Sequence, residues 1–206
     1  CPVAADVAGG DVYILPEGGQ FKLPFLPPVL HNHGNVIVSL GDVTRWMAGI
    51  AEELGVLIAT ETPAAAPLVE GGRLLGVRTG DKGVNRAGEP KPTYQAGADA
   101  LAKVTVLCEG PRGTIAKQLE QPLGLIQGRD PQVYATGVKE LWEVPPGRAA
   151  KGRVIHTMNW PLRADTFGGG FIYTMSRDRI DIGFVVGLDY RDPFTDPHHE
   201  FQRFKT

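Results

Sequence analysis

The sequence predicts a mixed chain with an α/β part over residues 31–128 and an antiparallel sheet over residues 129–192, completed by a hairpin in residues 1–30. Three observations support this α+β and α/β prediction. The chain has 27 glycines and 17 prolines, which favour strands joined by turns over long helices. One amphipathic helical stretch lies between two apolar runs near residue 50. After Pro131, helical periodicity gives way to a series of strand-like runs.

The composition is that of a globular protein and excludes several function classes. Hydrophobic residues make up 42% of the chain, charged residues 21%, and the formal net charge is −2. This balance carries no electrostatic footprint for nucleic acid. No apolar run reaches the roughly 18 residues of a membrane-spanning helix, and no secretory signal pattern is present.

Cysteine usage and the chain ends carry further expectations. Cys1 and Cys108 are the only cysteines, so the chain holds neither a disulfide framework nor a complete set of zinc or iron–sulfur ligands. A reducing compartment is the simplest interpretation. The chain starts at Cys1 without a methionine and stops within a helix-like pattern, so we expect a piece of a longer protein.

Two short apolar runs predict an N-terminal β-hairpin. They are Asp11–Leu15 and Phe21–Leu26, and they flank the glycine-containing loop Pro16–Gln20. Burying the apolar side chains would contribute about 1.5–3 kcal/mol each, on the order of ten in total. That magnitude suits either a domain core or docking on a bilayer surface. The side chains are Ile14, Leu15, Phe21, Leu23, Phe25 and Leu26.

The α/β part begins with a predicted strand–helix–strand unit. Asn35–Leu40 and Val56–Thr60 are predicted strands, and Asp42–Leu54 between them has the apolar spacing of a helix. Asp42 is a candidate N-cap, and Gly55 is a candidate residue just after the C-cap. This order predicts a parallel crossover.

Further along, Leu68–Arg78 predicts a hairpin that turns at Glu70–Gly72, and a turn-rich loop with extended parts follows. Lys103–Cys108 predicts a buried strand that continues through a glycine-bearing turn into a helix, Thr114–Leu119. Such a junction can face a phosphate or a nucleotide. The full G-x-G-x-x-G motif is absent, so an ordinary strand–helix turn is an equal alternative.

The second part predicts four strands and one helix. The strands are Val133–Trp142, Val154–Trp160, Gly169–Met175 and Ile180–Leu188, and the helix is Pro193–Lys205. The third strand begins within Phe167–Tyr173, where three glycines lie between aromatic residues. Glycines in a strand mark either a bulge or a place where a ligand approaches the backbone.

Conventional catalytic constellations are missing. No G-x-S-x-G motif occurs, and Cys108 at the end of a predicted buried strand has the setting of an inert structural cysteine. His31 and His33 indicate a polar turn rather than a metal site. His156 lies in a strand and could point into a pocket or toward solvent, with a structural role favoured. The residues alone name no reaction, no catalytic residue and no metal ligand.

A series of motifs nevertheless resembles one family. In the first half they are Asn32–Leu40, Trp46–Met47, Ala51–Val56, Ala102–Val106, Glu109–Gly110, Arg112–Gly113 and Lys117–Leu119. In the second half they are Gly137–Glu143, His156–Thr157, Trp160–Leu162, Gly168–Gly169, Gly183–Tyr190 and Glu200–Phe204. Their order is similar to the middle of the electron-transfer flavoprotein:ubiquinone oxidoreductases. Trp-Pro-Leu, then Gly-Gly, then Gly-Phe-Val-Val-Gly-Leu-Asp-Tyr is the most specific combination.

The resemblance implies a membrane-associated enzyme that takes electrons from reduced electron-transfer flavoprotein and passes them through a 4Fe-4S cluster and FAD to ubiquinone. It implies a glutathione-reductase-type FAD domain over 31–128, a quinone-binding sheet over 129–192 with the hairpin 1–30, and the start of a following helix at 193–206. The cluster cysteines and the main dinucleotide motif lie outside this sequence. We therefore expect an internal fragment, inactive alone.

The resemblance also implies site residues. Gly168 and Gly169 would contact the quinone through their backbone, lined by Phe167 and Phe171. The turn at Glu109, Gly110 and Arg112 is similar to a flavin-contacting turn. The hairpin would dip into the bilayer of the mitochondrial inner or bacterial cytoplasmic membrane without a spanning helix. Departures from the family pattern are Pro111 for cysteine, Asn159 for glycine, Phe167 for tyrosine, Gly170 for serine and Thr174 for histidine.

Two alternatives remain at this point. One is a prenyl-lipid FAD reductase of the geranylgeranyl type, and the other is a non-catalytic module that binds a lipophilic ligand or a membrane surface.

Overall fold

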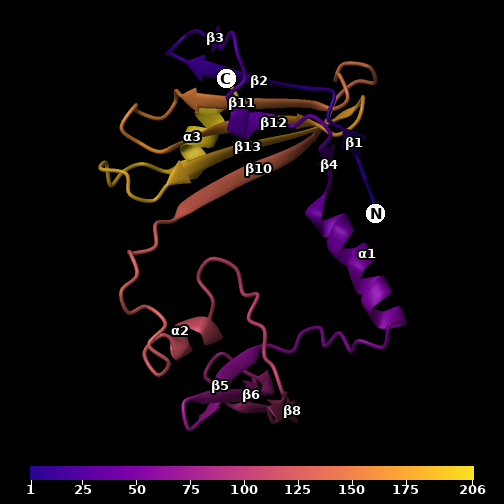
Figure 1. The fold of residues 1–206 in the computed structure, drawn as a ribbon, viewed down its shortest axis with the longest axis vertical. Coiled ribbons are helices and arrows are strands. Elements are labelled where there is room, and N and C mark those ends of the chain that lie inside the picture. The colour runs from indigo at the N-terminus through magenta and orange to yellow at the C-terminus, as the bar shows by residue number, and fades with distance from the viewer. The chain divides into compact units, whose positions relative to one another are not determined.

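A computed structural model describes all 206 residues, which form two compact units (Figure 1). The first unit consists of residues 1–56 and 132–206, and the second of residues 57–131. The segment 31–56 thus groups with the sheet, whereas the sequence-based boundary falls at residue 31. The assignment of the regions to a cofactor domain and a quinone domain stays a prediction.

A six-stranded sheet forms the body of the first unit, in the order β10-β13-β12-β11-β2-β3. Its strands are β2 (Gly9–Leu15), β3 (Phe21–Lys22), β10 (Ala135–Glu143), β11 (Arg153–Asn159), β12 (Gly168–Thr174) and β13 (Arg179–Gly187). All four strands predicted in the second part are confirmed. The hairpin is confirmed too, because Tyr13 pairs with Lys22 and Ile14 with Phe21.

One pairing in this sheet departs from the antiparallel prediction. β2 runs parallel to β11, with Val12 opposite His156 and Leu15 opposite Asn159, while the other neighbouring pairs are antiparallel. The N-terminal hairpin therefore joins the sheet through its first strand and leaves β3 at the edge (Figure 1).

One face of the sheet, called the α3 face here, is covered by helix α3 (Pro197–Phe204). Phe201 of the helix is fully buried with Leu162, Phe184 and Val186. The helix begins at Pro197, later than predicted, because the Asp196 side chain accepts the His198 N–H at 2.9 Å and caps it.

The opposite face is called the His156 face, and it carries the alternate residues of the same strands, among them Val154, His156, Phe171, Tyr173 and Asp181. A two-stranded ladder packs at one end of it, made of β1 (Ala5–Asp6) and β4 (Val36–Ile37). Ala5 and Ile37 are buried there against Val154, with Tyr173 partly buried beside them.

The predicted parallel crossover is wrong. Of the predicted strand Asn35–Leu40 only β4 forms, and it pairs antiparallel with β1, while Val56–Thr60 has no strand. Helix α1 (Leu40–Glu53) is present, but its N-cap is Ser39, whose Oγ accepts the Asp42 N–H at 3.4 Å. Gly55 follows the C-cap with φ +85°, as predicted. No helix is both long and apolar enough to cross a bilayer.

The second unit contains two small antiparallel sheets and a short helix. The elements are β5 (Ala64–Glu70), β6 (Arg73–Thr79), β7 (Lys82–Val84), β8 (Pro90–Gln95), β9 (Asp99–Leu101) and α2 (Ile115–Leu119). The hairpin of β5 and β6 is confirmed, and Gly71 and Gly72 supply the positive φ angles of its turn. A 3-10 turn, η1 (Pro28–Leu30), completes the elements of the chain.

The prediction that Lys103–Cys108 is a buried strand is wrong for this chain. The segment has no strand assignment, and Val104 and Val106 are each 76% exposed. No strand of the described chain pairs with it, and an apolar run becomes a strand only beside a partner. Cys108, predicted to be an inert buried thiol, is exposed as well.

Candidate functional site

The glycine strand β12 is the first candidate site, and its geometry explains each glycine. Gly168 and Gly169 both have φ +150°, a conformation that side chains rarely permit. A Cβ on Gly168 would meet the carbonyl oxygen of Val185, and a Cβ on Gly169 would meet that of Thr157. Both glycines therefore allow neighbouring backbone to approach closely, which is a structural need independent of any ligand.

Gly170 and Phe171 are fixed by packing in the same strand. A Cβ on Gly170 would enter the ring of Phe204 from α3, and the Gly170 N–H donates to Thr157 Oγ1 at 2.9 Å. The ring of Phe171 lies over Gly183 of β13 on the His156 face. Phe167, which precedes the strand, is 72% exposed.

The four predicted quinone residues therefore lie within residues 167–171 but are divided between the faces of the sheet. Strand alternation directs Gly169 and Phe171 toward the His156 face and Gly168 toward the α3 face. Their role toward a quinone stays a prediction.

Polar side chains lie beside Phe171 on the His156 face: His156, for which the sequence favoured a structural role, and Tyr173 and Asp181, which the sequence analysis did not single out. The rings of His156 and Tyr173 meet edge to face with centroids 5.9 Å apart, and Tyr173 lies 4.8 Å from Phe171. Asp181 is the cross-strand partner of Tyr173, and its Oδ2 accepts a hydrogen bond from Lys139 Nζ at 3.0 Å. Only the strand register brings these residues together, so no local motif could have found them.

Burial shifts the protonation of two of these groups. It lowers the pKa of His156 below its ordinary value, which keeps the imidazole neutral at neutral pH. Burial, and then the charge of Asp181, raise the pKa of Tyr173, which keeps the phenol protonated. The two side chains thus offer hydrogen-bond donors on an otherwise apolar surface.

A cavity of about 660 Å³ opens beside this pair. Apolar side chains of β4 and its neighbours line it together with the polar residues Asn32, Asn35, His156 and Tyr173. A second cavity, of about 350 Å³, lies on the α3 face beside the hairpin, and its lining is mostly apolar. Its lining includes Leu15, Ile172 and Phe204. Neither cavity is lined by Phe167, Gly168, Gly169 or Phe171.

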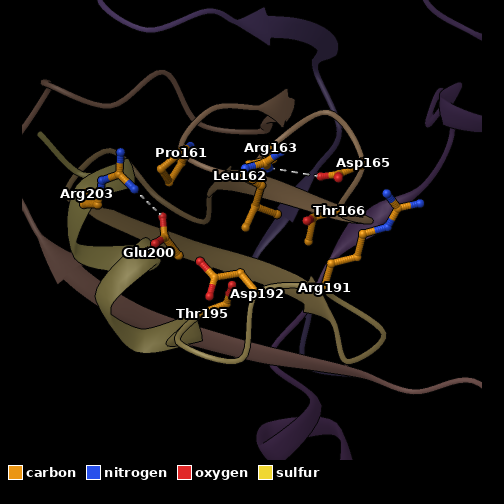
Figure 2. Close-up of a pocket in the computed structure, with 10 residues that line it drawn as sticks. All are labelled: Pro161, Leu162, Arg163, Asp165, Thr166, Arg191, Asp192, Thr195, Glu200 and Arg203. Carbon is orange, nitrogen blue, oxygen red and sulfur yellow. Dashed lines mark hydrogen bonds and ion pairs between the residues drawn. The ribbon is translucent and has the colours of Figure 1, made fainter.

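A third cavity, of about 390 Å³, is charged (Figure 2). Three arginines and three acidic residues line it, and Figure 2 shows Arg203 beside Glu200 and Arg163 beside Asp165. These ion pairs have N–O distances of 2.9 Å and 3.4 Å. Such a balanced, polar lining does not suit an apolar ring.

In the turn predicted to contact the flavin, the side chain of Glu109 binds the backbone amides that a ligand would need. The Glu109 carboxylate accepts the N–H groups of Thr114, Ile115 and Ala116 at 2.9–3.0 Å. These bonds, with those from Ile115 and Ala116 strongest, lower the pKa of Glu109. Since a carboxylate already takes the amides at the start of α2, the turn does not fit a phosphate. Gly110, at φ +74°, and Arg112 are exposed, and contact with the flavin ring stays a prediction.

The hairpin presents part of the predicted membrane-facing set. Phe21 and Phe25 are 58% and 66% exposed, whereas Ile14, Leu15, Leu23 and Leu26 are partly buried. Val29 is 90% exposed and was missed because it lies beyond the apolar runs. At residues 31–34 the chain turns, as predicted, and His31 Nε2 bonds to the Leu26 carbonyl at 2.8 Å.

The fold of this chain is similar to the folds of two solved structures. A geranylgeranyl bacteriochlorophyll reductase-like protein from Thermoplasma acidophilum has a TM-score of 0.63 and 12% identity, over 98% of this chain and 45% of that protein. A flavin-dependent brominase variant has a TM-score of 0.54 and 15% identity, over 98% of this chain and 48% of that protein. At such low identity the likeness concerns the fold alone.

Sequence relatives identify the family. Residues 134–206, which hold β10 to α3, match the family model "ETF-QO, ubiquinone-binding". Electron transfer flavoprotein-ubiquinone oxidoreductases from Pseudomonas aeruginosa and Bos taurus are 40% and 42% identical over 99% of this chain. A probable mitochondrial one from Schizosaccharomyces pombe is 43% identical over 90% of it. The chain belongs to the electron transfer flavoprotein-ubiquinone oxidoreductase family, and it spans 29–38% of the length of these relatives.

Proposed function

We propose that the intact protein containing this chain transfers electrons from reduced electron-transfer flavoprotein, through a 4Fe-4S cluster and FAD, to ubiquinone. The observation that carries the proposal is the match of residues 134–206, which hold β10 to α3, to a ubiquinone-binding family model, supported by relatives of about 40% identity named for this activity. The cluster would be held by residues outside this sequence, and FAD would supply the electrons that reduce the quinone.

Within this function, the sheet would hold the quinone ring on the His156 face, against Gly169 and Phe171. The support is physical: the rings of Phe171 and Tyr173, with centroids 4.8 Å apart, give this face an aromatic surface. A flat, partly apolar ring gains most from such a surface. Phe167 would border the same site from the strand end, and Gly168, which is directed toward the α3 face, would reach it only through its backbone.

The hairpin would hold the protein on the surface of the mitochondrial inner membrane or of a bacterial cytoplasmic membrane. The exposed Phe21, Phe25 and Val29 support this proposal, since each would leave water on entering the bilayer interface. Several relatives are named as mitochondrial, and no helix of the chain can span a membrane.

The decisive experiment uses the intact, detergent-solubilised protein. Reduced electron-transfer flavoprotein should bleach its flavin absorbance, and a short-chain ubiquinone analogue should restore it. A flavin that is reduced but is not reoxidised by the quinone would contradict the proposal.

Relatives of about 40% identity named for electron transfer to ubiquinone favour the main function over the alternative of a prenyl-lipid reductase. Such a reductase would consume its reduced flavin on the double bond of a prenyl substrate rather than on a quinone. Adding a geranylgeranyl lipid in place of the quinone separates the two candidates.

A further inference from the structure

We propose that His156 and Tyr173 deliver the protons that ubiquinone takes up on reduction, and that the cavity beside them connects the pair to water. The inference rests on the proposed function and deepens it, because it adds proton donors to a site described so far only by its shape and apolar surface.

The register of the strands places both donors next to the proposed ring position. His156 lies directly opposite Phe171 in the β11–β12 ladder, and Tyr173 is two residues along from Phe171 on the same face. The edge-to-face contact of His156 and Tyr173, at 5.9 Å, makes them one cluster. A ring held against Gly169 and Phe171 therefore has both side chains at its border.

Both side chains are half-buried, which suits proton transfer to an apolar ligand. A neutral imidazole carries one N–H donor and one acceptor nitrogen, so His156 can give a proton on one side and take one on the other. Its low pKa and the high pKa of Tyr173, both caused by burial, fix these protonation states.

Two charged groups lie beside His156 and Tyr173 on this face. Asp181 of β13 is opposite Tyr173, and Lys139 of β10 pairs with Asp181. Asp181 Oδ1 is buried with no hydrogen-bond partner, an arrangement that costs free energy unless another group or water uses it. From the other side, β2 contributes the apolar Val12, and the cavity wall contributes the uncharged Asn32 and Asn35.

The chemistry balances with these groups. Reduction of a quinone to a quinol adds two electrons and two protons, and the proposed function supplies the electrons. At each carbonyl oxygen an O–H bond forms while the N–H of His156 or the O–H of Tyr173 breaks. As the N–H proton leaves, the acceptor nitrogen of His156 takes up a proton from water, so the ring stays a neutral imidazole, and the Tyr173 phenolate regains its proton from water in the same way. The adjacent cavity, of about 660 Å³, admits many water molecules.

The test compares two electron acceptors in the intact protein. His156→Gln and Tyr173→Phe keep much of the volume of each side chain but change its proton chemistry. Reoxidation of the reduced flavin is followed by stopped-flow, first with a ubiquinone analogue and then with ferricenium, which accepts one electron and no proton. The series covers about pH 6 to pH 9, around the ordinary pKa of histidine, in H₂O and D₂O.

The expected result is selective for the quinone. In each variant the reduction of the quinone should slow by about a hundredfold or more, because a positioned proton donor typically contributes about 10²–10⁴-fold. The pH profile and solvent isotope effect should also change, while oxidation by ferricenium and equilibrium binding of the quinone analogue stay at the wild-type level. His33→Gln and Tyr134→Phe, at exposed positions, serve as matched controls.

The outcomes separate the two proposals. A wild-type protein that does not reduce quinone would overturn both the function and this inference. A wild-type protein that reduces quinone, with variants that keep its rate and pH profile, would overturn the inference alone. Weakened quinone binding with an unchanged pH profile would also overturn it and would leave the pair a packing role.

Discussion

Asp11 and Lys22 lie 2.7 Å apart, Oδ1 to Nζ, and this ion pair joins the two strands of the hairpin. The other carboxylate oxygen of Asp11 bonds to Arg153 of β11, so one buried carboxylate connects the hairpin to the sheet. The side chains of Lys22 and Arg153 are 53% and 38% exposed, so water screens the attraction in both ion pairs.

Asp11→Asn should loosen the hairpin because it removes the shared negative charge and leaves Arg153 without a counter-charge. We expect a loss of about 1–3 kcal/mol in the free energy of unfolding and faster tryptic cleavage after Lys22. Thermal unfolding and limited proteolysis of the intact protein measure the two effects. Asp6→Asn, at an exposed position, is the control, and equal cleavage rates in both variants would contradict the prediction.

The sequence could predict those elements whose signal is local. The strands β10 to β13 each carry an apolar run bounded by turn residues, and the hairpin has its glycine-containing loop. The parallel joining of β2 to β11 depends on residues about 140 positions apart, as for Asp11 and Arg153, and no local pattern encodes it. The runs Val56–Thr60 and Lys103–Cys108 failed as strands because the described chain offers them no partner.

The candidate site was predictable to a similar extent. The glycine strand stands out in the sequence, and its resemblance to a family pointed to a quinone. The proximity of His156 to Tyr173 follows only from register between strands. The sequence pointed to the turn at Glu109. It did not show that the Glu109 carboxylate accepts the backbone N–H groups at the start of α2.

Replacing two exposed aromatic residues of the hairpin tests the membrane proposal. Phe21→Glu with Phe25→Glu should weaken binding of the intact protein to phospholipid vesicles by at least about tenfold, because burying one phenylalanine contributes about 1.5–3 kcal/mol. Vesicle flotation measures the bound fraction. Phe194→Glu is the matched control, since Phe194 is 90% exposed but lies outside the hairpin. A similar loss of binding in the control would contradict a specific role of the hairpin.

Asn159, at a position where the resemblance implies glycine, has a φ of +73°, in the left-handed region. Asparagine tolerates this left-handed conformation better than other side chains, while β-branched residues do not. Asn159→Gly should change the free energy of unfolding by less than about 1 kcal/mol, and Asn159→Val should cost about 1–2 kcal/mol. Thermal unfolding compares them with Met158→Val at the preceding, extended position. Equal effects of the two Asn159 variants would refute the backbone explanation.

Gly170 and Phe204 form a size match between β12 and α3. A methyl group at position 170 would enter the Phe204 ring, so Gly170→Ala should destabilise the fold by about 1–3 kcal/mol through overpacking. Adding Phe204→Leu should recover part of that loss, and a double-mutant cycle from thermal unfolding measures the coupling. Gly137→Ala is the control, because its Cβ would lie 3.9 Å from its nearest neighbours. Strictly additive effects would show that the two residues do not constrain each other.

Glu140 gives the sheet domain a pH-dependent contact with the end of α3. Lys205 Nζ donates to its two oxygens at 2.7 and 2.8 Å, and Trp142 Nε1 donates at 2.6 Å. These bonds, with the Lys205 bond strongest, lower the pKa of Glu140 below its ordinary value of 4.5. As the pH falls, the unfolded chain takes up the proton first, so this stabilisation is complete above about pH 4.5 and is lost as the pH falls through the lower folded-state pKa.

The unfolding temperature of Glu140→Gln should therefore lie below that of the wild type at neutral pH, and the difference should shrink as the pH falls below about 4.5. Thermal unfolding of the intact protein at a series of pH values measures it. Glu143→Gln is the matched control, because Glu143 is exposed on the same strand, and its Oε1 lies 3.5 Å from Arg179, its only ion-pair partner. A difference for Glu140→Gln that stays constant into acid would contradict the prediction that the charge of the Glu140 carboxylate provides this stabilisation.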